Sequence, residues 1–150
     1  MLRITKQTDY GIVLMTYFAG DKSRSVHNAR DLATAAALPL PTVSKILKGL
    51  ARADLLKSHR GVKGGYSLAR EPDDIAVGEI IRAIEGPIAI TECLDDSASD
   101  CDIQRCCPVR ANWQRINEAV RVALHAVPLT EMIPDFGRIE PTIQPSGGEA

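Results

Sequence analysis

The sequence lacks several features that mark other classes of protein. No stretch approaches the roughly 18 consecutive apolar residues of a membrane-spanning helix, and no apolar run follows a basic start in residues 1–11. Cysteine is absent outside residues 93–107, and neither a C-x-x-C pair nor an internal repeat is present. We therefore expect a cytoplasmic protein with one core, no membrane partner and no structural disulfide framework.

Charge is divided unevenly along the 150 residues. The net charge is −1, yet residues 1–70 contain 12 Lys or Arg against 4 Asp or Glu, whereas residues 71–150 contain 6 against 15. A basic segment suits a polyanion, and an acidic segment is repelled by one. The first half is therefore predicted to face nucleic acid.

The N-terminal region is predicted to begin with an amphipathic helix that starts at Thr8 and ends near Gly20. Thr8 can accept hydrogen bonds from the first turn, so we expect it to cap the helix. An apolar stripe follows at helical spacing. It comprises Tyr10, Val13, Leu14, Tyr17 and Phe18.

Two shorter helices are predicted next, with the spacing of a helix-turn-helix. Asn28 can cap the first, which Pro39 ends, and Pro41 suits the first turn of the second. The second helix has apolar residues on one face and polar or basic residues on the other. Its polar side resembles a recognition helix, which enters the major groove of DNA.

Residues 55–69 read as a basic β-hairpin, or wing. Gly61, Gly64 and Gly65 permit a tight turn, and Arg60 and Lys63 are expected at its tip. A further short helix is predicted over residues 75–87. Residues 1–87 are thus interpreted as a winged-helix DNA-binding domain in a mostly α fold.

Six residues are candidates for contact with DNA. Thr42, Ser44 and Lys45 are expected to reach base edges, and Lys48 is expected to meet a phosphate. Arg60 can enter a narrow minor groove, with Lys63 beside it on the wing. The alternative is an ordinary solvated basic face or a winged helix used for protein contacts. The charge division, helix pair and basic hairpin together favour DNA.

The C-terminal part is predicted to form a dimerisation helix. From Pro108, apolar residues recur at steps of four and three, which is typical of a helix that pairs with another helix. They are Val109, Trp113, Ile116, Val120, Ala123 and Val127. We assign residues 108–136 to this helix and a short turn, and residues 137–150 to a disordered tail. A single apolar seam indicates a homodimer.

All four cysteines lie in the irregular segment 88–107, as Cys93, Cys101, Cys106 and Cys107. Clustered thiolates in a reducing compartment select zinc, Cu(I) or an iron-sulfur cluster. The closely spaced ligand pair of a structural zinc site is missing. Because adjacent side chains rarely converge on one metal, three cysteines and one ligand from elsewhere are the simplest set. A cluster held this way would be exposed and labile, as a sensor requires. A regulator that forms a disulfide or holds zinc, and a thiol-dependent enzyme, are the alternatives.

The motifs resemble those of the IscR/NsrR/RirA family of winged-helix regulators over roughly residues 1–135. The resemblance rests on LRITKQTDYG, PTVSKILKGLARADLL, HRGVKGGYSLA and IAVGEIIRAIEG, followed by the cysteine segment. TECLDDSASDC and CCPVRANWQRIN are most similar to regulators of the SUF operon for iron-sulfur cluster assembly. This implies a repressor that binds double-stranded operator DNA according to cluster status.

The resemblance also implies the ligands. Cys93, Cys101 and Cys107 are expected to bind a 2Fe-2S or 4Fe-4S cluster. Where IscR-like members have a ligating His, this chain has Arg110, whose guanidinium cannot ligate. NsrR-like members use an Asp of the partner subunit, and Asp9 stands at that position. Asp9 as an N-terminal helix cap and Cys106 as the fourth ligand are the open alternatives. His27, His59 and His125 are interpreted as structural or surface residues.

Overall fold

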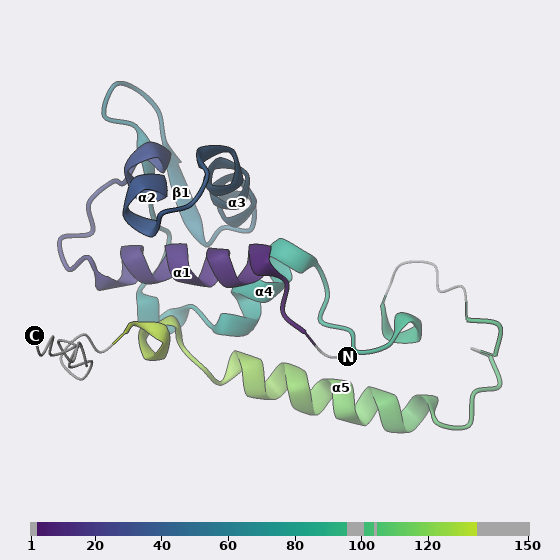
Figure 1. Cartoon of the computed structure of the whole chain (residues 1–150). Helices are drawn as coiled ribbons and strands as arrows, with labels where there is room; N and C mark the ends of the chain where they lie inside the picture. Colours follow the sequence, from purple (N-terminus) through teal and green to yellow (C-terminus); the bar gives the residue numbers. More distant parts are fainter. Residues whose placement is uncertain (1–2, 96–100, 104, 135–150) are drawn as a thin grey trace, which may run out of the picture.

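The computed structural model describes residues 3–95, 101–103 and 105–134. Three helices, α1 (Lys6–Gly20), α2 (Ala29–Ala36) and α3 (Leu40–Arg52), precede an antiparallel hairpin of β1 (Leu56–His59) and β2 (Gly65–Leu68). The chain continues through η1 (Pro72–Asp74), α4 (Val77–Glu85), η2 (Glu92–Leu94), α5 (Arg110–His125) and η3 (Leu129–Met132). This is the mostly helical winged helix-turn-helix that the sequence predicts (Figure 1).

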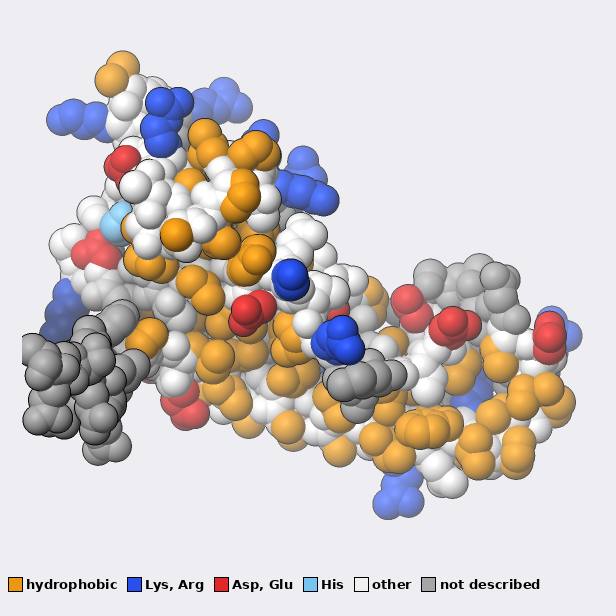
Figure 2. All heavy atoms as spheres, viewed as in Figure 1, with side chains coloured by type: hydrophobic (Ala, Val, Ile, Leu, Met, Phe, Trp, Pro, Cys, Tyr) orange, Lys and Arg blue, Asp and Glu red, His pale blue; other side chains and the backbone are white. Residues whose placement is uncertain are grey.

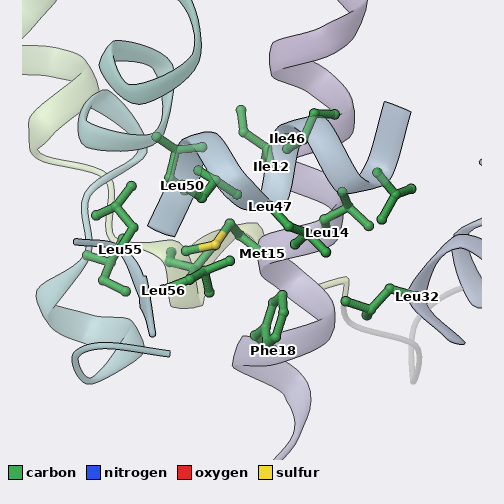
Figure 3. Close-up of a cluster of buried hydrophobic side chains, with 14 of the residues drawn as sticks. Ile12, Leu14, Met15, Phe18, Leu32, Ile46, Leu47, Leu50, Leu55 and Leu56 are labelled. Carbon is green, nitrogen blue, oxygen red and sulfur yellow. The ribbon is translucent and has the colours of Figure 1, made fainter. Parts of the chain in front are cut away.

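The core lies where α1, α3 and α4 meet the base of the hairpin (Figure 3). Leu14, Leu47 and Leu50 are fully buried at its centre. Leu129 of η3 is also fully buried, so the chain returns to the core after α5. Burial of this apolar surface supplies the main driving force for folding of the N-terminal region.

The first helix begins one turn earlier than predicted. Thr5 caps α1, because its hydroxyl accepts a hydrogen bond from the Thr8 backbone N–H at 3.3 Å. Thr8 is buried instead, and its hydroxyl donates to Oε1 of Glu85 at 2.5 Å. The predicted cap at Thr8 is therefore wrong, since a carboxylate from a distant helix engages that side chain.

The buried face of α1 also differs from the predicted stripe. Val13 and Tyr17 are exposed, while Ile12 and Met15 are buried together with Leu14 and Phe18. Gly11 lies against α4, where an added Cβ would be 2.2 Å from Cδ1 of Ile84. The close approach at Gly11 turns a different side of α1 toward the core.

The other predicted elements match the structure closely. Asn28 caps α2 by accepting from the Asp31 N–H at 2.8 Å, and α2 ends at Ala36, before Pro39. Pro41 lies in the first turn of α3. Gly86 follows the last residue of α4 with a φ of +90°, as expected for a helix end.

A backbone bridge fixes the base of the wing. The N–H of His27 donates to the Tyr66 carbonyl at 2.9 Å, and the Tyr66 N–H donates back at 2.8 Å. Gly65 permits this approach, because a Cβ there would lie 2.4 Å from the His27 carbonyl oxygen. An isolated antiparallel β-bridge therefore joins the link between α1 and α2 to the two-stranded hairpin.

The last long helix, α5, lies along one edge and extends past α1 and α4 (Figure 1). No residue of α5 is buried. Its C-terminal end packs against the core through Leu124, and Val127, two residues after the helix, packs there too. His125 lies against Gly78 of α4. Val127 of the predicted seam thus packs on its own chain. None of the described helices is long and apolar enough to cross a membrane.

Candidate DNA-binding face and cysteine segment

The outer face of α3 presents the predicted recognition residues. Val43, Ile46, Leu47 and Leu50 point into the core, which leaves the opposite side of α3 for solvent. Lys45 and Lys48 are exposed, and Thr42 and Ser44 are half-buried. A helix held by one apolar side and open on its polar side can enter a major groove.

The wing carries its cations beside α3. A turn closed by the Gly64 N–H and the Gly61 carbonyl at 2.9 Å places Val62 and Lys63 at the tip, and Arg60 just before it. Val62, Lys63 and Arg60 are all exposed. Figure 2 shows Lys and Arg side chains gathered at the end of the molecule from which the hairpin projects.

A hollow of about 720 Å³ separates the wing tip from the starts of α2 and α3. Arg30, Asn28 and Lys63 line it, together with Leu40 and Val62. Arg30 was not among the predicted DNA contacts. Its position two residues after the cap Asn28 is the sequence signal for it, because the first turn of the first helix in such a module lies against the DNA backbone.

Asp21 braces the base of the wing. Its carboxylate accepts hydrogen bonds from the backbone and hydroxyl of Ser23 and of Ser25, and it lies 2.9 Å from Nε2 of His27. Hydrogen bonds from Ser23, and then from Ser25, hold the pKa of Asp21 far below its ordinary value. The His27 ring packs edge-on against Phe18 with centroids 5.4 Å apart. His27 therefore has a structural place, as predicted.

The cysteine segment lies at the opposite end of the chain fold from the wing (Figure 1). All four cysteines are free thiols; Cys93, Cys101 and Cys107 are half-buried, and Cys106 is exposed. Cys93 belongs to η2, with its Sγ 3.3 Å from the Thr91 hydroxyl. Residues 96–100 and 104, between the predicted ligands, are outside the described part of the chain.

Within the described residues of this single chain, no three His, Cys, Asp or Glu side chains are grouped to hold a metal ion. The predicted ligands Cys93, Cys101, Cys107 and Asp9 therefore do not form an assembled site in one subunit. Their donor chemistry still fits an iron-sulfur cluster, for which thiolates are the usual ligands. The ligand set remains a prediction.

Asp9 lies on the first turns of α1, with an exposed side chain. Thr5 takes the capping role, so the alternative of Asp9 as helix cap is wrong. The Asp9 carboxylate makes no hydrogen bond or ion pair with the described residues. Arg110 begins α5, and its Nε atom is buried and has no hydrogen-bond partner among the described residues.

Glu85 joins the start of α1 to the end of α4. Residues 86–91 follow it and lead to η2 and Cys93; we call them the stem of the cysteine segment. Glu85 accepts from the Thr5 N–H at 3.1 Å and from the hydroxyls of Thr5 and Thr8 at 2.9 and 2.5 Å. Burial opposes ionisation, but these hydrogen bonds hold the pKa of Glu85 below its ordinary value. A groove of about 570 Å³ continues from here along Ile88 and Val120.

Comparison with known proteins places this architecture. Residues 4–135 match the model of the Rrf2 family, described as iron-dependent transcriptional regulators. The chain is 31% identical over 131 residues to the HTH-type transcriptional regulator CymR of Bacillus subtilis, covering 87% of this chain and 89% of CymR. It is 25% identical over 134 residues to the regulator NsrR of Geobacillus kaustophilus, covering 89% of this chain and 91% of NsrR.

Solved structures agree with the fold. The structure of CymR, the global cysteine regulator of B. subtilis, matches with a TM-score of 0.68 and 32% identity over 89% of this chain and 97% of that chain. The IscR structure from T. potens matches with a TM-score of 0.62 and 28% identity, covering 88% of this chain and 86% of that one. CymR and NsrR are named as transcriptional regulators, which favours the expected regulator over the alternative of a thiol-dependent enzyme. The chain belongs to the Rrf2 family of DNA-binding transcriptional regulators.

Proposed function

We propose that this regulator is a cytoplasmic homodimeric repressor of SUF iron-sulfur assembly genes that senses cluster status. Cys93, Cys101 and Cys107 hold a 2Fe-2S or 4Fe-4S cluster, with Asp9 of the partner subunit as fourth ligand. One observation carries the proposal: three half-buried free thiols lie on a segment that leads directly into a helix with no buried residue. A ligand bound there acts next to a long helix that its own chain leaves unburied.

The dimer is inferred from the apolar side chains that α5 leaves uncovered. Trp113 is 39% exposed and Ile116 46%, and Val109, at the N-cap of α5 on the same side, is 45% exposed. Such a row on one helix costs solubility unless another apolar surface covers it, and a second copy of the same helix has the complementary pattern. Pairing of two α5 helices would set the distance between the two recognition helices, on which reading of a palindromic operator depends.

The donor chemistry supports a cluster more than a bare metal ion. A bound cluster supplies redox and oxygen sensitivity, because partly exposed clusters react readily. The chain's own contribution is to hold three thiolates on one segment and to offer an unengaged carboxylate, Asp9, on another element. Because Asp9 and the three cysteines do not form one group among the described residues of a single chain, a ligand set that contains all four would join two subunits.

Anaerobic purification tests the cofactor. We expect a brown protein with iron and sulfide, which the Cys93→Ser, Cys101→Ser and Cys107→Ser variants lack. Cys106→Ser is the matched control, since it removes an exposed thiol from the same segment and should keep the colour. A colourless protein with stoichiometric zinc, or one that responds to oxidants only by forming a disulfide, would favour the alternative of a regulator without a cluster. The relatives also include CymR, described as the global cysteine regulator of B. subtilis.

Operator binding is tested by its dependence on salt. Each phosphate contact releases counterions, so affinity should fall steeply as salt rises. Lys48→Ala removes one phosphate contact from each subunit of the dimer, so it should lower the slope of log affinity against log salt by about 2. Lys22→Ala is a suitable control, because Lys22 is exposed on the link after α1 and is not a proposed contact. A flat salt dependence of the wild type would exclude a phosphate-binding face and leave protein contacts as the role of the winged helix.

A further inference from the structure

Asn117 of α5 binds the backbone that leads into the cysteine segment. Its Oδ1 accepts from the Ile90 N–H at 3.0 Å, and its Nδ2 donates to the Ile88 carbonyl at 3.0 Å. Asn117 is half-buried, and both bonds span more than 25 residues of sequence. One amide therefore uses its acceptor and a donor to hold two peptide groups of the same short stretch.

The stretch held by Asn117 has little other backbone support. It runs from Gly86, where α4 ends, to η2, which contains Cys93, and it forms no strand. A cavity of about 270 Å³ lies between it and α5, lined by Pro87, Ile88, Leu94 and Asn117. Packing is incomplete at this junction. The two hydrogen bonds of Asn117 tie this stretch directly to α5.

We propose that Asn117 is a positioning residue that sets the register of the cysteine-segment stem on α5, and so couples the state of that segment to α5. We call the two hydrogen bonds of Asn117 the Asn117 clamp. Cys93 lies three residues after Ile90, so this clamp fixes the backbone from which the first proposed ligand projects. If the stem moves, Asn117 and α5 must move with it or lose both bonds. This inference rests on the proposed function, because the segment is the proposed sensor.

The simpler alternative is that Asn117 is only a local anchor. Three variants separate these roles. Asn117→Ala removes both bonds. Asn117→Asp keeps an acceptor for Ile90 but loses the donor to Ile88. Gln114→Ala is the matched control, because Gln114 is an exposed amide one turn earlier on α5 and has no bond to the described residues. Thermal melting of each variant checks that the fold is intact.

The clamp itself is tested in the cofactor-free protein, where the answer does not depend on any cluster. By hydrogen exchange, the Ile90 amide should exchange at least about fivefold faster in Asn117→Ala, since a typical net hydrogen bond corresponds to such a factor. Asn117→Asp should largely retain protection at Ile90. Alkylation of Cys93 should accelerate in Asn117→Ala, while alkylation of the exposed Cys106 and all rates in Gln114→Ala stay unchanged.

Coupling is tested in the cluster-loaded protein. We expect Asn117→Ala to lose its visible absorbance several-fold faster in air and to narrow the ratio of operator affinities between loaded and cofactor-free protein. Unchanged exchange at Ile90 would overturn the clamp. Faster exchange with an unchanged Cys93 alkylation rate and affinity ratio would reduce Asn117 to a local anchor and overturn the positioning role. A wild type that binds no cluster would refute the proposed function, while exchange and alkylation would still decide on the clamp.

Discussion

The DNA-binding region and the C-terminal helix α5 of this protein differ in how much apolar surface they bury within one chain. In residues 3–86 each of the helices α1 to α4 buries apolar side chains in one shared core, and Leu14, Leu47 and Ile80 are fully buried. In α5 no residue is buried, and Trp113 and Ile116 face solvent. The first region is complete within one chain. The second, as we propose, is complete only with a partner chain and a cofactor, so a signal can act on it without unfolding the DNA-binding region.

Truncation of a core side chain should give the largest effect. Leu47→Ala removes a fully buried side chain from α3, and we expect it to lower the free energy of unfolding by about 2–5 kcal/mol, because it leaves a cavity. Val122→Ala, at 58% exposure on α5, should change it by less than about 1 kcal/mol. Urea titration of both variants at low protein concentration measures the difference. Equal losses would contradict the contrast between the two regions.

Substitution of Gly65, at the base of the wing, should have the next largest effect. Gly65→Ala places a Cβ 2.4 Å from the His27 carbonyl oxygen at a φ of +154°, so we expect a loss of about 2 kcal/mol and weaker operator binding. Gly49→Ala is the control, since nothing lies within 4 Å of its added Cβ in the middle of α3. That change should stabilise the protein by up to about 1 kcal/mol. A tolerated Gly65→Ala would mean that the wing base is not fixed by this bridge.

Substitutions in α5 should affect association of the dimer more than the stability of the monomer. Trp113→Ala removes a large exposed side chain from α5, and we expect it to weaken the dimer about tenfold or more while the unfolding free energy of the monomer changes little. Analytical ultracentrifugation over a range of concentrations measures this. Gln114→Ala, on the polar side of the same helix, should leave the dimer intact. A monomeric wild type would remove the proposed role of α5.

The smallest effect should be a pH dependence at the wing base. The Ser23 and Ser25 hydroxyls hold the pKa of Asp21 far below its ordinary value, so the ionised form stabilises the fold. This contribution is complete at neutral pH and is lost as the pH falls below about 4, the value in the unfolded chain. Asp21→Asn should therefore be less stable than the wild type at pH 7, and the two should converge in acid. Replacing Ser23 and Ser25 by Ala should reproduce part of the change in unfolding free energy. If the unfolding free energies of Asp21→Asn and the wild type differed by the same amount at every pH, this account would be contradicted.

Local patterns in the sequence were sufficient for most of the N-terminal region. Asn28 caps the helix it was expected to cap, and the apolar spacing of α3 correctly leaves Lys45 and Lys48 on the open face. The glycines of residues 61–65 marked the wing turn. These signals depend on residues within one or two turns of each other, where periodicity and capping chemistry act directly.

The rest depended on contacts between residues far apart in the chain. Thr5 caps α1 in place of Thr8 because Glu85, 77 residues away, engages the Thr8 hydroxyl. Gly11 decides which side of α1 is buried, through its approach to Ile84. Asn117 reads as an ordinary polar position until the stem of the cysteine segment lies on it. The amino-acid sequence determined which residues could cap a helix, form an apolar helix face or bind a metal. Tertiary packing alone decided which of them meet, because a hydrogen bond across 80 residues leaves no local periodicity.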